Sequence, residues 1–224
     1  MSTDPSIVVV RNEVQADYEY HCDALASYFP GARAVDFPAG ERFDPDTVDG
    51  VVLSGSTAGV YEADDRPWIR EQERLVRELV DREVPTLGVC FGHQVANSAL
   101  GGTVRHEGMT ARLVEIELAG DPLFAGVEPV VAASHGDVVT DAGEDMAVIA
   151  STDYYHAFGT RHRRAPLWTV QFHPEFTGDI RDQLAEDFDW TETDYSFADV
   201  NAPHVFENFR SLVTGPDEHV AHRS

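Results

Sequence analysis

The chain has 224 residues, enough for one α/β domain with a sizeable core, and 42% of them are hydrophobic. Its formal net charge is −24, from 40 acidic and 16 basic residues, and every basic residue is an arginine. Such an acidic surface repels nucleic acids and anionic membranes, so we expect neither as a partner. The lack of lysine excludes Schiff-base chemistry and an ATP-binding P-loop. The composition resembles that of haloarchaeal proteins, which work in concentrated salt.

Two cysteines cannot build a disulfide framework, and no apolar run is long enough to span a membrane. The N-terminus lacks the basic and long apolar segments of a signal peptide, which predicts a cytoplasmic protein. Cys22 falls in an apolar series with helical spacing, so we interpret it as a buried, unreactive thiol. No group of histidine, cysteine and acidic residues has a recognised zinc spacing. We therefore expect no metal and no cofactor.

The first half of the chain alternates strand and helix patterns. Strands are predicted at 7–10, 32–37, 50–55 and 84–89, and helices at 14–29, 67–82 and 92–100. Charges four residues apart in the second of these helices predict three ion pairs, Glu73–Arg77, Arg74–Glu78 and Glu78–Arg82. This alternation predicts a parallel sheet with helices on both faces.

The second half is richer in strand patterns. Strands are predicted at 103–118, 127–133, 146–151 and 166–173, and helices at 178–190 and 204–213, with a polar loop at 191–203. No repeat or linker interrupts the chain. We therefore expect a single domain over residues 1–224, with its core at about 7–214 and a frayed tail at 215–224.

The segment GVCFG, residues 88–92, joins a predicted buried strand to a predicted helix. It matches the G-x-nucleophile-x-G pattern, in which flanking glycines permit a sharp chain reversal and a strained backbone at the nucleophile. The N-terminus of the following helix favours a thiolate at Cys90, and the Phe91 N–H would be free to stabilise an oxyanion. The alternative is a small apolar cysteine within a glycine-rich turn of the core.

A nucleophilic cysteine needs a base, and the base needs a group that orients it. Among ten histidines, His173 has a distinctive setting in VQFHPEF. Pro174 favours an extended backbone at His173, which would place His173 and Glu175 on the same face. Glu175 could then hold one ring nitrogen while the other faces the sulfur. The plainer alternatives are a surface histidine at a strand end and half of a metal site.

Two further segments could complete a site. LSGSTAG ends a predicted strand at the edge where parallel sheets bind ligands, and the backbone at Gly55 and Ser56 could supply a second oxyanion N–H. ASHGD places Ser134, His135 and Asp137 in a predicted turn after an apolar strand. For this second segment taken alone, ordinary turn chemistry is the favoured interpretation.

Together these residues resemble the class I glutamine amidotransferase family. That family combines a G-x-C-x-G-H-Q elbow, an upstream oxyanion loop of small residues and a downstream F-H-P-E motif. The matching segments are Gly88–Gln94, Ser54–Ser56 and Phe172–Glu175. The resemblance covers about residues 7–214. It implies a flavodoxin-like, three-layer α/β sandwich with a mostly parallel central sheet and a small antiparallel strand region.

The resemblance also implies a mechanism. Cys90 would attack the side-chain amide of glutamine, or a γ-glutamyl amide, and form a thioester. His173, oriented by Glu175, would protonate the departing ammonia and then activate water. The N–H groups of Ser56 and Phe91 would hold the oxyanion.

The substrate-binding residues implied by the resemblance are Gly55, Gln94, Ser134 and His135, with the last three at the amino-acid end of the substrate. His93 adjoins the elbow but is not the expected base, and we expect it to hydrogen-bond within the fold.

Two features differ from many synthetase-linked members of the family. The loop reads SGSTAG where those members have S-G-G-P, and the elbow carries Phe91. Together with the segment DDRPWIREQ that follows the loop, these features resemble free-standing members similar to the amidotransferase part of GMP synthase, and some free-standing members hydrolyse γ-glutamyl peptides. The sequence therefore leaves three functions open: an amidotransferase that passes ammonia to a separate synthetase partner, a free-standing γ-glutamyl peptide hydrolase, and a catalytically silent regulatory module.

Overall fold

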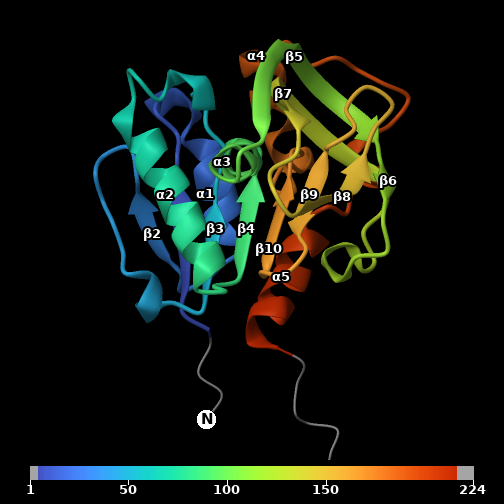
Figure 1. Cartoon of the computed structure of the whole chain (residues 1–224). Coiled ribbons are helices and arrows are strands. Elements are labelled where there is room, and N and C mark those ends of the chain that lie inside the picture. Colours follow the sequence, from blue (N-terminus) through green and yellow to red (C-terminus); the bar gives the residue numbers. More distant parts are fainter. Residues whose placement is uncertain (1–4, 216–224) are drawn as a thin grey trace, which may run out of the picture.

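The computed structural model describes residues 5–215, which form an eight-stranded sheet and a two-stranded sheet (Figure 1). The large sheet has the order β2-β1-β3-β4-β10-β9-β8-β6. Its first five strands are parallel: β2 (Arg33–Asp36), β1 (Ile7–Arg11), β3 (Gly50–Leu53), β4 (Thr86–Val89) and β10 (Leu167–Val170). The other three pair antiparallel: β9 (Gly159–His162), β8 (Met146–Ser151) and β6 (Glu117–Leu118).

Helices cover both faces of the parallel strands. The helices are α1 (Tyr20–Ser27), α2 (Pro67–Asp81), α3 (Phe91–Ala99), α4 (Arg181–Asp187) and α5 (His204–Thr214). Side chains of β1 alternate between two cores, because successive residues of a strand point to opposite faces. Ile7 and Val9 pack in the cluster that holds residues of α1 and α5, whereas Val8 and Val10 pack with α2 and α3. The predicted α/β fold with a mostly parallel central sheet is confirmed.

The two-stranded sheet pairs β5 (Thr103–Glu115) with β7 (Val130–Asp141). The predicted strand at 127–133 was too short, and the ASHGD segment lies inside β7 rather than in a turn. Strand β7 extends past residue 133 because β5 pairs with it along almost its whole length. The register shifts between His106 and Thr110, so the pairing is irregular opposite Gly136. This irregularity lies beside the candidate site described below.

The predicted helix at 14–29 was too long at its N-terminal end. A 3-10 turn occupies Ala16–Tyr18 and α1 begins only at Tyr20. The Glu13 carboxylate accepts hydrogen bonds from the backbone N–H groups of Val14 and Gln15, and Gln15 has an extended backbone. Those bonds hold the chain outside the helix at these residues.

Only one of the three predicted ion pairs along α2 forms, between Glu78 and Arg82. Glu73 instead accepts a hydrogen bond from Ser98 Oγ, and Arg77 donates to the carbonyl of Ala99. Both side chains therefore bind α3 rather than their own helix. Residue spacing within one helix cannot predict such contacts between two helices.

One strand and the bounds of two other elements in the second half also differ from prediction. Strand β9 was not predicted, and β10 ends at Val170 rather than at residue 173. The predicted helix at 178–190 contains a 3-10 turn at Gly178–Ile180 followed by the short α4. His173 lies outside the strand, in a hydrogen-bonded turn that follows β10 and is described below.

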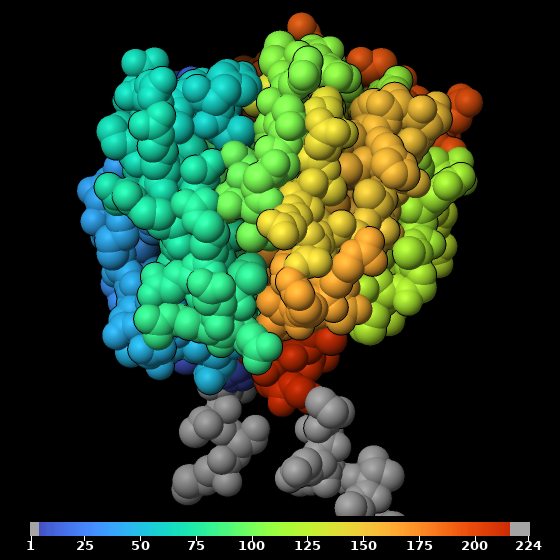
Figure 2. Space-filling view, in the orientation of Figure 1, coloured from blue at the N-terminus to red at the C-terminus, as the bar shows by residue number. Residues whose placement is uncertain are grey.

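The described chain starts and stops at the same end of the molecule, opposite the end toward which β4 points (Figure 1). In the space-filling view, α2 lies on one side and the second half of the chain on the other, with residues of the α3–β5 region between them (Figure 2). None of the helices between residues 5 and 215 has the length and apolar character needed to cross a bilayer. Apart from Gly215, the tail expected to fray lies outside the described residues.

Candidate active site

Cys90 stands at a sharp turn between β4 and α3, with a backbone φ of 53° and ψ of −104°. This conformation is costly for a residue with a Cβ and is typical of a nucleophile held in an elbow. The neighbouring glycines are needed for close packing. A Cβ on Gly88 would lie 2.5 Å from the carbonyl oxygen of Gly92, and a Cβ on Gly92 would lie 2.4 Å from the carbonyl oxygen of Leu53.

His173 follows β10 in a turn closed by a hydrogen bond from the Phe176 N–H to the His173 carbonyl, 3.1 Å long. The chain therefore turns at Pro174 and Glu175, and the expected extended chain from His173 through Glu175 is wrong. The turn nevertheless places the Glu175 carboxylate 2.8 Å from Nδ1 of His173. Phe176 stacks on the face of the imidazole, with ring centroids 4.1 Å apart. His173 is thus held by both a carboxylate and an aromatic ring.

Both ring nitrogens of His173 face hydrogen-bond acceptors. Nδ1 faces the Glu175 carboxylate, and Nε2 lies 3.1 Å from the carbonyl oxygen of Ser134. Burial disfavours the charged ring, but attraction to Glu175 and to the Cys90 sulfur outweighs it and raises the pKa of His173 well above its ordinary value. A raised pKa favours the charged imidazolium, the form of the ring that can donate a proton.

Gly55 lies where the cysteine and histidine converge. A Cβ on Gly55 would lie 3.5 Å from Cβ of Cys90, 3.3 Å from Cε1 of His173 and 3.4 Å from Cε1 of His21. The absence of a side chain at Gly55 therefore leaves room for the sulfur and the imidazole to share the pocket.

Two backbone N–H groups near Cys90 are available as oxyanion donors. Phe91 is the first residue of α3, so its N–H has no acceptor within the helix. Ser56 lies in the loop after β3 and lines the same pocket as Cys90. The N–H groups of Phe91 and Ser56 lack a hydrogen-bond acceptor within the described part of the chain. In contrast, the Gly92 N–H donates to the Ser54 carbonyl, at 3.2 Å, and joins the elbow to this loop.

One pocket of about 330 Å³ brings together most of the candidate residues. Those that line it are Ser56, Cys90, Gln94, Ser134, His135 and His173. Of the other three, Gly55 and Phe91 belong to the loop and elbow already described, and the Phe91 ring is buried against Trp68. Glu175 lies behind His173 and is 2% exposed. Residues predicted to form one site therefore do converge in space.

His93, the residue beside the elbow, is fully buried away from the pocket. Its Nδ1 lies 2.7 Å from Thr169 Oγ1 and its Nε2 lies 3.0 Å from the Tyr155 hydroxyl. Burial, with repulsion from His135, lowers the pKa of His93 to about 3. A neutral ring held by two hydroxyl groups serves packing within the fold, as expected.

The wall opposite the loop carries polar groups from β7 and α3. Burial, followed by repulsion from His173, lowers the pKa of His135 to about 4, so its ring is neutral. Gln94 Nε2 donates to the carbonyl of Asp137 at 3.4 Å. The Asp137 carboxylate lines the pocket and accepts hydrogen bonds from the Tyr61 hydroxyl and from Nδ1 of His106, at 3.3 and 2.9 Å.

Sequence reasoning missed several residues of this pocket, above all Glu13 and His21. Glu13 is a carboxylate just after β1, at the carboxyl edge of a parallel sheet, and that position was a usable signal. His21 was missed because it adjoins Cys22 in a segment that was interpreted only as an apolar helix face. Across residues 5–215, no group of three or more His, Cys, Asp or Glu side chains is arranged to hold a metal.

The comparisons with known proteins agree with this geometry. The family model described as "Glutamine amidotransferase class-I" matches residues 30–188, which include Cys90, His173 and Glu175. The chain belongs to this family. The match also covers the loop after β3 and most of the pocket wall.

Curated relatives of this class I glutamine amidotransferase include glutamine-hydrolysing GMP synthases. The Streptomyces avermitilis protein is 36% identical over 132 residues, which cover 56% of this chain and 23% of the relative. The Francisella tularensis subsp. mediasiatica protein is 31% identical over 160 residues, covering 69% of this chain and 28% of the relative. The chain thus aligns with only about a quarter of the length of these relatives.

Solved structures show the same fold. A glutamine amidotransferase from Thermotoga maritima has a TM-score of 0.70 at 20% identity, covering 94% of this chain and 97% of the other. A Thermoplasma acidophilum protein described as one subunit of a GMP synthase has a TM-score of 0.69 at 21% identity, covering 96% of both chains. At these identities the likeness concerns the fold alone.

Proposed function

We propose that the chain hydrolyses the side-chain amide of glutamine through the triad Cys90, His173 and Glu175, releasing glutamate and ammonia. The observation that carries this proposal is the pairing of a strained nucleophile elbow with a buried His–Glu pair around one pocket. Membership of the class I glutamine amidotransferase family supports it. Backbone strain and strongly shifted pKa values are typical of functional sites, so the strained Cys90 and the raised pKa of the buried His173 argue against a catalytically silent module.

The proposed chemistry proceeds in two steps. The Cys90 thiolate attacks the amide carbon, and the N–H groups of Ser56 and Phe91 stabilise the oxyanion. The C–N bond breaks as the His173 imidazolium gives its Nε2 proton to the leaving nitrogen, which departs as ammonia. His173 then takes a proton from water, which attacks the thioester and releases glutamate and the Cys90 thiolate. Glu175 keeps Nδ1 protonated throughout.

We assign the amino-acid end of the substrate to the wall formed by Gln94, Ser134, His135 and Asp137. The Asp137 carboxylate offers an acceptor for a substrate ammonium group, and polar groups of the other three residues offer hydrogen bonds. Gly55 contributes by leaving space beside the imidazole, since a Cβ there would lie 3.3 Å from Cε1 of His173.

We further propose that residues 7–214 act as one catalytic domain and pass ammonia to a separate synthetase subunit. Phe206 and Phe209 of α5 share a core with residues of β1, β4 and β10, so this helix belongs to the same unit as the elbow. The relatives named as GMP synthases are about four times longer than the region they share with this chain. The Thermoplasma acidophilum protein is an example of a similar fold in a shorter chain described as one subunit of such an enzyme.

A free-standing γ-glutamyl peptide hydrolase is the second candidate. The pocket is also lined by the large side chains of Tyr18, Met109 and Phe188, together with Asp187. Tyr18 stacks on Phe188 with ring centroids 5.4 Å apart. These side chains could contact a leaving group larger than ammonia.

One experiment tests both functions. The purified protein is incubated in molar salt with glutamine and with a panel of γ-glutamyl peptides, and products are followed by mass spectrometry. We expect release of glutamate, and Cys90→Ala should reduce the rate by about 10⁴-fold or more, because the covalent route is lost. Thr214→Ala, at the far end of α5, is the matched control. Undiminished activity in Cys90→Ala would refute the mechanism, and turnover of peptides in preference to glutamine would favour the second candidate.

A further inference from the structure

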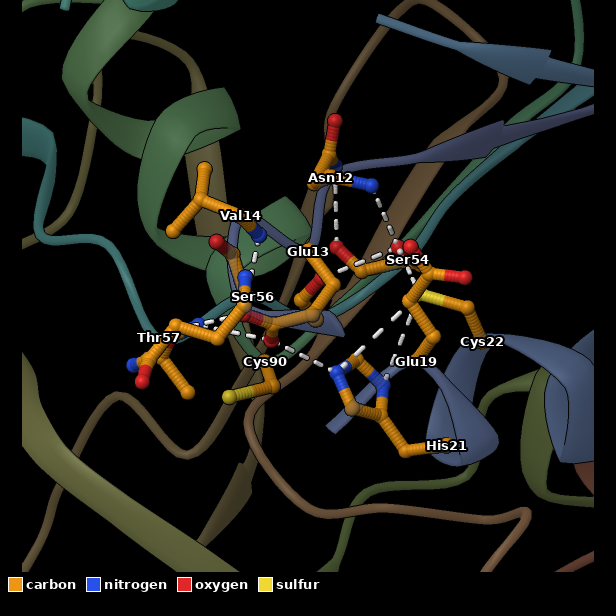
Figure 3. Close-up of polar contacts among 12 residues, drawn as sticks. Asn12, Glu13, Val14, Glu19, His21, Cys22, Ser54, Ser56, Thr57 and Cys90 are labelled. Atoms are coloured by element: carbon orange, nitrogen blue, oxygen red, sulfur yellow. Dashed lines mark hydrogen bonds and ion pairs between the residues drawn. The ribbon is translucent and has the colours of Figure 1, made fainter. Parts of the chain in front are cut away.

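The Glu13 carboxylate lies at the centre of a buried hydrogen-bond network next to the loop after β3 (Figure 3). Oε1 accepts from the N–H groups of Val14 and Gln15, at 2.8 and 2.9 Å, and from the Thr57 hydroxyl at 2.5 Å. Oε2 accepts from the Thr57 N–H at 3.0 Å and faces Nε2 of His21 at 2.9 Å. Five donors therefore surround two oxygens, an arrangement that only an ionised carboxylate can satisfy.

The charge state of the network follows from these contacts. Burial favours the neutral acid, but hydrogen bonds from His21, Thr57 and Gln15 outweigh it and lower the pKa of Glu13. Burial likewise opposes a charge on His21, yet its contacts with Cys22 and Glu13 raise the pKa of His21 to about 10. The groups facing His21 are Glu13, Cys22 and His173, whose ring lies edge-on to it with centroids 6.2 Å apart.

Residues at the end of β1 hold both halves of the loop that follows β3. Asn12 donates from its backbone to Ser54 Oγ and from its side chain to the Ser54 carbonyl, both at 3.0 Å. Glu13 holds Thr57 at the other end of the loop. Ser56, one of the two oxyanion donors proposed above, lies between these fixed points. Both fixed points are therefore held by residues more than forty positions earlier in the chain.

We propose that Glu13, paired with His21, is a positioning residue that anchors Thr57 and thereby fixes the backbone of its neighbour Ser56, so that the Ser56 N–H serves as an oxyanion donor. The inference rests on the proposed hydrolysis for its catalytic consequence, but the holding of the loop is a property of the free protein. Glu13 does not itself react, because its two oxygens are committed to donors on the loop, on the segment after β1 and on α1.

The test replaces Glu13 by glutamine, which keeps the shape but turns one acceptor into an N–H₂ group that faces donors. We expect faster hydrogen–deuterium exchange in peptides covering residues 54–58. We also expect kcat to fall about 10²-fold with little change in KM, because an oxyanion donor acts mainly in the transition state. Thr57→Val should show a smaller effect of the same kind, and Thr57→Ser should restore wild-type behaviour.

Two controls separate loop positioning from damage to the fold. Glu19→Gln alters a neighbouring exposed carboxylate that pairs with Arg11, and it should leave both exchange and kcat unchanged. The rate at which iodoacetamide alkylates Cys90 reports on the elbow without using the oxyanion donors, and it should be unchanged in Glu13→Gln. If Glu13→Gln fails to fold, the pair Thr57→Val and Thr57→Ser decides the result.

Different outcomes would overturn the positioning role of Glu13 and the proposed amide hydrolysis. Unchanged exchange at residues 54–58 in Glu13→Gln would overturn the positioning role, as would faster exchange with full kcat. A wild-type protein that hydrolyses no glutamine or γ-glutamyl substrate would overturn the proposed function instead. In that case the exchange experiment would still decide whether Glu13 holds the loop.

Discussion

At the scale of single residues, the state of His173 is set by what surrounds it. Burial lowers the pKa of an imidazole, as it does for His93 and His135, where repulsion from a neighbouring histidine adds to the effect. His173 differs because it has a carboxylate at Nδ1 and a sulfur nearby. The same type of side chain is therefore a packed core group at position 93 and, in the proposed mechanism, a proton donor at position 173.

This contrast predicts the pH dependence of Glu175→Gln. Because the pKa of His173 is raised in the folded protein, its imidazolium persists above the ordinary pKa and is lost only as pH rises further. Removing the Glu175 charge should shift the alkaline limb of kcat/KM to lower pH and reduce its maximum about tenfold or more. A pH profile with glutamine as substrate measures this, beside Glu144→Gln as an exposed control. An alkaline limb at the wild-type position would refute the role given to Glu175.

At the scale of elements, the site depends on how closely α3 approaches β3. Glycine at position 92 allows the first turn of α3 to lie against the backbone of Leu53. The same approach lets the Gly92 N–H reach the carbonyl of Ser54. The elbow and the loop after β3 are therefore one packed unit, although they belong to neighbouring strands.

Gly92→Ala should therefore destabilise the protein by about 1–3 kcal/mol, because the new methyl group meets a backbone oxygen that cannot easily move. Urea unfolding followed by circular dichroism measures the change. Gly120→Ala is the control, since a Cβ at Gly120 would meet nothing within 4 Å. Equal stability of Gly92→Ala and wild type would show that α3 and β3 can separate without cost.

At the scale of the whole molecule, the dominant feature is the net charge of −24. Like charges repel across a compact surface, and salt screens them because the Debye length falls from about 10 Å at 0.1 M to about 3 Å at 1 M. The haloarchaeal interpretation of the composition rests on this charge, and a stability that depends on salt is the physical consequence that we predict.

We expect Tm to rise by about 3 °C or more between 0.1 and 1 M potassium chloride, which corresponds to about 1 kcal/mol for a chain of this size. The triple variant Asp81→Asn, Glu107→Gln and Glu117→Gln removes three exposed negative charges and should depend less on salt. Differential scanning fluorimetry measures both proteins, with sucrose as a non-ionic comparison. A Tm that does not change with salt would contradict the halophilic interpretation.

The sequence by itself determined the alternation of strands and helices and the elbow at Cys90. It also singled out His173 and Glu175 as the pair expected to lie beside Cys90. These features are local, because glycine spacing, a buried strand and a short motif each leave a readable pattern within a few residues. Even there, local reasoning predicted an extended chain at His173 where a hydrogen-bonded turn closes, although the His–Glu pairing was the same.

Only the tertiary structure decided how the pocket is built around these residues. Glu13 and Thr57 meet because β1 and β3 are neighbours in the sheet, and Asp137 meets Tyr61 and His106 because β7 pairs with β5 beside the loop after β3. Such contacts depend on strand order and register, which no local pattern encodes. The elbow at Cys90 and the pairing of His173 with Glu175 were therefore predictable from the sequence, whereas the groups that hold the loop after β3 emerged only in the folded chain.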